Sequence, residues 1–304
     1  MRMWAYRSIA PNGFSLVELL VAMTIGLMML GALLSIYIAT SMAVRQSDTV
    51  TRMAEDASIA LETLARHIRM AGYSKLMLMA PRNSAPVDGQ VAQTADSNLA
   101  GAGLRGCDGG FASTTVTWSA LACSNISTQP DAIAIRYEGD SFNTEAAGGN
   151  DASDCLSQGV APNTNSAVDS SLQFALVEAR FFINANKDLS CAGNGNARFQ
   201  SQPLVRGVEF MRLRYGIASD MTESQVIRYV TAAQVDALAG DADQKWGRVV
   251  AVRICIQMVS PTADQGKAAP FINCDGILTH PADKYVHHPF TTTVSLRNRA
   301  GITP

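Results

Sequence analysis

The stretch GFSLVELLVAMTIGLMMLGALLSIYIATSMAV, residues 13–44, decides how this 304-residue chain is organised. From Leu19 to Val44 no side chain is charged, over 26 consecutive residues. About 20 apolar residues suffice for a helix to cross a hydrocarbon core roughly 30 Å thick. We therefore predict one membrane-spanning helix, with the more polar remainder forming a globular head.

The charges that flank this stretch indicate its orientation. Arg2 and Arg7 precede it, whereas acidic and basic side chains are mixed after it. The positive-inside rule then places the first residues in the cytoplasm and the head on the exported side. Removing Arg2 and Arg7 from the 24 basic residues and Glu18 from the 26 acidic ones leaves a net charge of about −3, so we expect no nucleic-acid partner.

The segment Gly13-Phe14-Ser15-Leu16-Val17-Glu18-Leu19-Leu20 resembles the prepilin processing motif of type IV pilins and type II secretion pseudopilins. The resemblance combines a Gly before the scissile bond, an aromatic residue after it, and a lone carboxylate in the apolar helix. It implies cleavage between Gly13 and Phe14 by a prepilin peptidase, and N-methylation of Phe14. The expected organisation is then a leader (1–13), a transmembrane and filament-core helix (14–44), its amphipathic continuation (45–73) and a periplasmic β-rich head (74–304).

Glu18 needs a partner because an ionised carboxylate inside a bilayer costs about 2.5–3.5 kcal/mol on insertion scales. The resemblance implies that its partner is the α-amine created at Phe14, on the same chain or on a neighbouring subunit. Such a pair would set the register of assembly. The alternative is that Glu18 lies near the membrane interface and extends its carboxylate to water.

An ordinary secretory signal peptide is the competing interpretation of the N-terminus, with Ser41-Met42-Ala43 as its cleavage site. The apolar region of a signal peptide is about 7–15 residues long. The uncharged stretch here is longer and continues without interruption into a second helical pattern. The length therefore favours a retained membrane helix.

Apolar residues after the anchor recur at steps of three and four, which predicts an amphipathic helix that continues the membrane segment. They are Val50, Met53, Ala54, Ala57, Ala60, Leu61, Leu64, Ile68 and Ala71. Gly72-Tyr73 is the expected end of the helix, since Gly is a common terminator. Many major pilins carry a kinking Pro about 22 residues into the mature chain, but Ser35 occupies that position here.

The remainder predicts an antiparallel sheet with long loops. Segments rich in β-branched and aromatic residues are expected strands: 132–137, 174–183, 205–215, 249–259 and 291–296. Residues 84–128 and 139–170 have little periodicity and are expected to be surface loops. The predicted fold class is α+β, a type IV pilin-like fold whose long N-terminal helix packs on an antiparallel β-sheet head with disulfide-fastened loops.

Six cysteines lie in the predicted exported region: Cys107, Cys123, Cys155, Cys191, Cys255 and Cys274. An even number in an oxidising compartment indicates disulfides, although free buried thiols are the alternative. Six cysteines allow fifteen pairings, and the sequence does not select among them. Pairs of sequence neighbours, which close short loops, are the first expectation.

Two further pieces, residues 68–73 and residues 292–299, resemble the PilW family of minor pilins. The resemblance implies a low-abundance subunit that primes pilus assembly, at the tip. Its implied partners are the prepilin peptidase, other minor pilins, the major pilin and the inner-membrane assembly platform. It implies a single-pass inner-membrane protein that later reaches the pilus. A type II secretion pseudopilin and a tip adhesin or DNA-capturing protein remain alternatives.

We predict no enzymatic activity, no cofactor and no metal. Residues 101–106 match G-x-G-x-x-G but lack the flanking strand and helix, so a flexible loop is expected there. His280, Asp283, His287 and His288 match no metal template, and Pro281 and Pro289 suggest a solvated loop. Asn184, Asn186 and Asp188 lack the Gly and Glu of a calcium loop.

Overall fold

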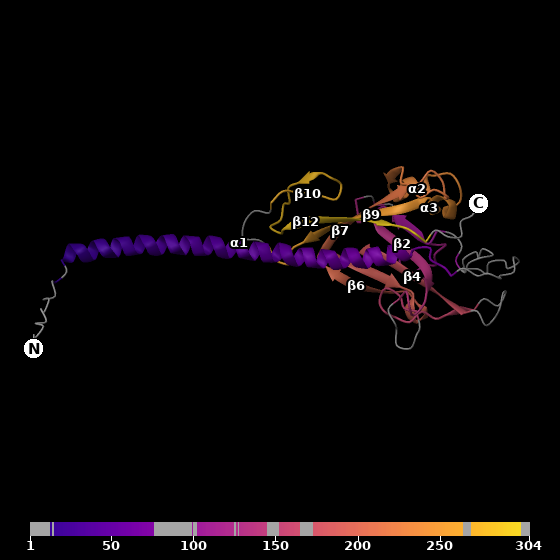
Figure 1. Ribbon diagram of the computed structural model, residues 1–304, viewed down its shortest axis with the longest axis horizontal. Helices are drawn as coiled ribbons and strands as arrows, with labels where there is room; N and C mark the ends of the chain where they lie inside the picture. Colours follow the sequence, from indigo (N-terminus) through magenta and orange to yellow (C-terminus); the bar gives the residue numbers. More distant parts are fainter. Residues whose placement is uncertain are drawn as a thin grey trace, which may run out of the picture. The chain divides into compact units, whose positions relative to one another are not determined.

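The computed structural model describes residues 13, 15–75, 99, 102–124, 126, 128–144, 152–164, 173–263 and 269–298. The chain divides into two compact units, Met1–Thr49 and Val50–Pro304. We refer to the second unit as the head. The long helix α1 begins in the first unit and ends in the second (Figure 1).

Helix α1 runs without interruption over Leu16–Met70. At a rise of 1.5 Å per residue its length is roughly 80 Å. It ends where the sequence predicts, because Gly72 adopts a positive φ of 75°, a backbone conformation that side chains with a Cβ disfavour. A Cβ at Gly72 would also contact the Asn298 carbonyl oxygen at 2.7 Å.

The part of α1 within the head buries one face. Met53, Ala57, Ala60, Leu64 and Ile68 follow each other at steps of three or four, and each is at most 2% exposed. They belong to one hydrophobic core with side chains from the strands of the head. The amphipathic pattern of the sequence thus corresponds to a packed helix face.

The described residues of the head form two larger antiparallel sheets and a two-stranded hairpin (Figure 1). The first sheet has the order β1 (Leu104–Cys107), β2 (Ala132–Gly139), β4 (Gln173–Ile183), β5 (Asp188–Gly193) and β6 (Gln200–Arg206), with β3 (Asn163–Thr164) paired to β4. The second has the order β12 (His287–Ser295), β9 (Val249–Val259), β7 (Val208–Ile217) and β8 (Arg228–Val230). The hairpin joins β10 (Phe271–Ile272) to β11 (Leu278–Thr279).

Three short helices complete the described elements. They are η1 (Gly195–Ala197), α2 (Ala232–Asp236) and α3 (Ala242–Gly247). Thr231 and Asp241 cap α2 and α3 with capping boxes, in which the third residue of the helix returns a hydrogen bond. Asp108, which follows β1, also accepts hydrogen bonds from the first two backbone amides of α2.

The predicted α+β fold with a long helix and an antiparallel head is confirmed, and β9 has the predicted bounds. The single strand expected over 205–215 is wrong. Gly207 adopts a φ of 73°, which breaks the segment into β6 of one sheet and β7 of the other. One glycine in a left-handed conformation therefore separates the two sheets at this point.

The loops expected over 84–128 and 139–170 are wrong in part, because β1 and β3 lie within them. The flexible loop expected at the G-x-G-x-x-G match is also wrong in part, since its last three residues belong to β1. A Cβ at Gly103 would collide with the backbone of Gly72, and one at Gly106 with the Tyr215 hydroxyl. These two glycines permit close packing of β1.

All six cysteines are paired, as Cys107–Cys123, Cys155–Cys191 and Cys255–Cys274. Each pair joins sequence neighbours, separated by 16, 36 and 19 residues respectively. The first links β1 to the segment that follows it, and the second fastens the loop before β3 to β5. The third ties the β10–β11 hairpin to β9.

Candidate functional site

The beginning of α1 carries the residues that the sequence singles out. Gly13 is exposed, and Glu18 is the acidic residue of the first helical turn. Phe14 lies outside the described residues. A carboxylate in the first turn interacts favourably with the positive end of the helix dipole.

Ser15 is a residue whose role the sequence interpretation missed. Its hydroxyl accepts a hydrogen bond from the Glu18 backbone N–H at 3.2 Å, and its carbonyl accepts one from Leu19 N–H, also at 3.2 Å. Ser15 therefore caps the helix immediately before Leu16. The pattern Ser-x-x-Glu is the sequence signature of such a cap, so the sequence alone contains the signal that predicts it.

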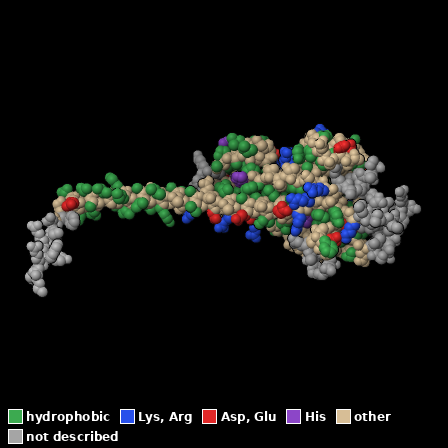
Figure 2. Space-filling view, in the orientation of Figure 1, with side chains coloured by type: hydrophobic (Ala, Val, Ile, Leu, Met, Phe, Trp, Pro, Cys, Tyr) green, Lys and Arg blue, Asp and Glu red, His purple; other side chains and the backbone are tan. Residues whose placement is uncertain are grey.

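Residues 16–44 of α1, which we call the apolar segment, expose their large hydrophobic side chains on all sides. Individual exposures range from 45% at Ile38 to 76% at Leu16 and Met28. Figure 2 shows hydrophobic side chains along this part of the helix, with charged side chains gathered further along the chain. By length and composition this is a helix able to cross a membrane.

Three hydroxyl groups within the apolar segment bond to their own helix. Thr24, Ser35 and Ser41 each donate to the carbonyl three residues earlier, at 2.9, 2.8 and 2.9 Å. Polar groups in hydrocarbon need internal partners, because no water is present there to bind them. Ser35 occupies the position where many major pilins have a kinking proline, and α1 is continuous through it.

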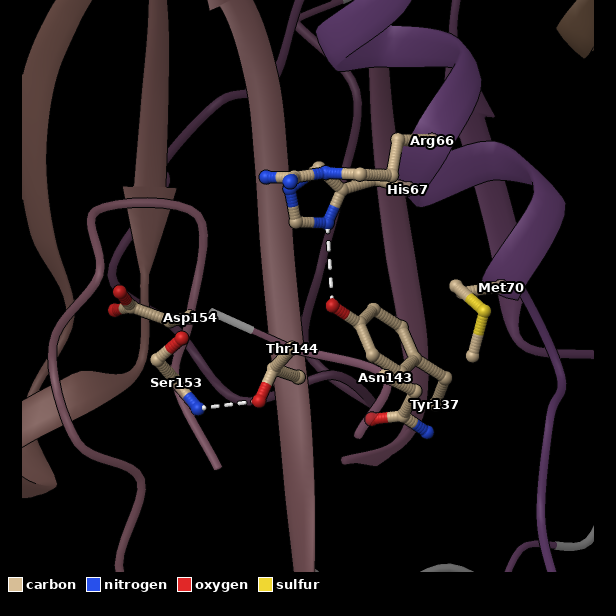
Figure 3. Close-up of a pocket in the computed structure, with 8 residues that line it drawn as sticks. All are labelled: Arg66, His67, Met70, Tyr137, Asn143, Thr144, Ser153 and Asp154. Atoms are coloured by element: carbon tan, nitrogen blue, oxygen red, sulfur yellow. Dashed lines mark hydrogen bonds between the residues drawn. The ribbon is translucent and has the colours of Figure 1, made fainter. Parts of the chain in front are cut away.

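A small polar cavity lies inside the head between α1 and the end of β2 (Figure 3). The Tyr137 hydroxyl lies 3.3 Å from His67 Nδ1, and the Ser153 N–H donates to Thr144 Oγ1 at 3.0 Å. Burial raises the pKa of Tyr137, so its hydroxyl stays protonated. The cavity measures about 10 Å³, which accommodates one water molecule and no substrate.

The His287 side chain contacts two acidic side chains, Glu209 and Asp283, and not the other histidines considered as metal ligands. Its Nδ1 contacts Glu209 Oε1, and its Nε2 lies 2.9 Å from Asp283 Oδ1. Each ring nitrogen therefore lies within hydrogen-bond distance of an acidic side chain. The solvated loop expected here is wrong for His287, His288 and Pro289, which belong to β12.

The other metal candidates have structural roles. The Asn184 side chain accepts hydrogen bonds from the backbone N–H groups of Asn186 and Asp188, and so forms the turn between β4 and β5. Within the described ranges, no group of three or more His, Cys, Asp or Glu side chains is placed to hold a metal ion.

Two family models match the chain. Residues 11–34 match the prokaryotic N-terminal methylation motif, and residues 180–298 match the family described as type IV pilus-assembly protein W. A type IV-like pilin from Thermus thermophilus is a structural neighbour with 14% identity and a TM-score of 0.43, covering 82% of this chain and 98% of that one. Comparison with curated protein sequences gives no match.

The first match includes Ser15 and Glu18, and the second runs from within β4 to just beyond the end of β12. One match therefore lies in the first part of the apolar segment and its preceding residues, and the other lies in the second half of the head. The chain thus carries an N-terminal methylation motif in residues 11–34 and, in residues 180–298, a region similar to type IV pilus-assembly protein W.

Proposed function

We propose that this protein is a minor pilin that primes type IV pilus assembly, as a structural and non-enzymatic subunit at the tip. Cleavage between Gly13 and Phe14 removes the leader, and Phe14 is N-methylated. The mature protein is anchored in the inner membrane by residues 14–44, with residues 74–304 in the periplasm. It then leaves the membrane with other minor pilins and the major pilin.

The observation that carries the proposal is the start of α1. Ser15 caps a helix that begins at Leu16, so proposed cleavage after Gly13 leaves only Phe14 ahead of the cap. The new α-amine would then belong to the residue just before the cap, while Glu18 lies in the first turn of the helix. We propose that Glu18 pairs with the α-amine of a neighbouring subunit and so sets the register of assembly.

Replacing Glu18 by Val tests the pairing. The variant should be cleaved normally, because the Gly13-Phe14 bond is unchanged. Its incorporation into pili should fall at least about tenfold, since loss of one charge pair in an apolar setting costs roughly 1–2 kcal/mol or more. Processing is followed by gel mobility and incorporation by immunoblotting of sheared pili.

Two controls accompany this experiment. Gly13→Leu marks the position of the uncleaved precursor, and Glu55→Val removes an exposed carboxylate from the part of the same helix within the head. Wild-type incorporation of Glu18→Val would contradict the register role. Normal piliation after deletion of the gene, with loss of a secreted protein instead, would indicate a secretion pseudopilin.

A further inference from the structure

Strand β12 ends the second sheet and has one side without a paired strand. It pairs with β9 over its full length, from His287 opposite Val259 to Ser295 opposite Ala251. Among the residues that the structure describes, no strand pairs with its other side (Figure 1). An unpaired edge presents backbone N–H and C=O groups that match an added strand.

The hydrogen bonds at both ends of β12 show which residues face outward. In an antiparallel strand the N–H and C=O of one residue point to the same side, and successive residues alternate. Leu296 N–H donates to Val250 O, and Val286 O accepts from Ser260 N–H, so even-numbered residues face β9. Thr291, Thr293 and Ser295 therefore direct their backbone groups outward.

Pro289 supports this assignment, because proline has no N–H and is tolerated in a strand only where that group would face outward. Its carbonyl oxygen lies 3.0 Å from the Nδ1 of the neighbouring His288. The first part of the edge is thus blocked. The part able to pair begins at Thr291.

A groove lies beside this edge, between β12 and the part of α1 within the head. It encloses about 440 Å³, which is within the range of roughly 300–1,000 Å³ of ligand sites in proteins. Its walls are small, apolar or hydroxylated side chains: Ala54, Ser58, Leu61 and Ala65 from α1, and Phe290 and Thr292 from β12.

The two charged residues of the groove neutralise each other. Arg69 Nη1 and Glu62 Oε1 form an ion pair at 3.1 Å, with both side chains largely exposed. The groove therefore presents no net charge to an occupant. A segment that pairs with the backbone of β12 beside the groove must be extended. The groove walls can accommodate uncharged side chains of modest size.

We propose that a neighbouring subunit adds an extended, uncharged segment to β12 as a further strand. The backbone of that segment pairs with Thr291, Thr293 and Ser295, and its alternate side chains enter the groove. The class of partner rests on the proposed function, since a minor subunit has other pilin-like subunits as neighbours and few copies of itself. The partner is therefore a different pilin-like subunit.

Site-specific crosslinking in cells tests this strand addition. A photoreactive amino acid replaces Thr291, which lines the groove, in the full-length protein. Irradiation should produce a crosslink to another pilin-like subunit, identified by mass spectrometry. The crosslinked peptide should have an alternating, uncharged sequence.

Thr293→Pro removes one outward N–H, and Thr293→Val is the matched control that keeps it. The crosslink should weaken about tenfold in the proline variant and remain unchanged in the valine variant, because a backbone hydrogen bond is lost and the proline ring obstructs the edge. Protease resistance and intact disulfides verify that each variant folds. Ser58→Trp fills the groove without altering β12 and should also weaken the crosslink, relative to Ser58→Ala.

Absence of a crosslink overturns the proposal, as do crosslinks within the chain, to a second copy or to lipid. Equal crosslinking in Thr293→Pro and Thr293→Val also overturns it. The crosslink is measured in membranes, whether or not pili form. If deletion of the gene leaves piliation normal, the proposed function fails; if deletion abolishes pili and the two Thr293 variants crosslink equally, only the strand addition fails.

Discussion

The two parts of α1 have the same secondary structure and opposite surroundings. In the apolar segment Leu34 is 60% exposed and no large side chain is buried, whereas Leu64 and Ile68 in the head are 0% exposed. Both parts are rich in apolar residues, but only the second alternates apolar with charged positions. A helix that is hydrophobic on all sides suits lipid or other subunits, whereas an amphipathic helix packs on the core of its own chain.

The head also relies on covalent links that the apolar segment lacks. Replacing Cys155 and Cys191 together by Ala should give the largest effect, because their disulfide has the longest sequence separation, 36 residues. The chain-entropy treatment gives a loss of about 4 kcal/mol. Guanidinium unfolding in detergent, followed by tryptophan fluorescence, measures it. Membrane insertion should not change, and its loss would show that the two parts depend on each other.

Leucine truncations in the two parts compare their packing directly. Leu64→Ala should lower the unfolding free energy of the head by about 3 kcal/mol, since it leaves a cavity in a closed core. Leu34→Ala, the matched control in the apolar segment, should leave the unfolding midpoint of the head unchanged. Equal effects of Leu64→Ala and Leu34→Ala on the unfolding of the head would contradict the different packing of the two parts of α1.

The smallest expected effect is local and depends on pH. The hydrogen bond from His287 lowers the pKa of Asp283 below its ordinary value of 3.8. A carboxylate with a lowered folded pKa contributes stability above its unfolded pKa and loses it as the pH falls through the folded value. The protection factors of amides around residues 283–287, which correct exchange rates for their intrinsic slowing in acid, should therefore fall when the pH falls from about 5 to about 3.

Asp283→Asn is the control for this pH dependence. It should exchange faster than the wild type at about pH 5 and respond less to acidification, because the titrating group is gone. An unchanged pH response in the variant would assign the effect to another group. The apolar segment should show no response in either protein.

Much of the fold could be predicted because its signals are local. The uncharged run up to Val44, the three- and four-residue steps around Leu64, and the terminating Gly72 each depend on neighbours within a few turns. The bounds of β9 followed from β-branched residues in one unbroken run. The division at Gly207 was missed, since β6 and β7 read as one run of strand-forming residues.

At the candidate site, the apolar segment, the motif around Gly13 and the position of Glu18 could be found in the sequence alone, because each is a property of consecutive residues. Only the three-dimensional structure revealed the role of Gly103 and Gly106, the contacts of His287 with Glu209 and Asp283, and the open edge of β12. Each of these depends on segments far apart in the sequence, such as β12 and α1, and no local pattern reports which surfaces such segments leave uncovered.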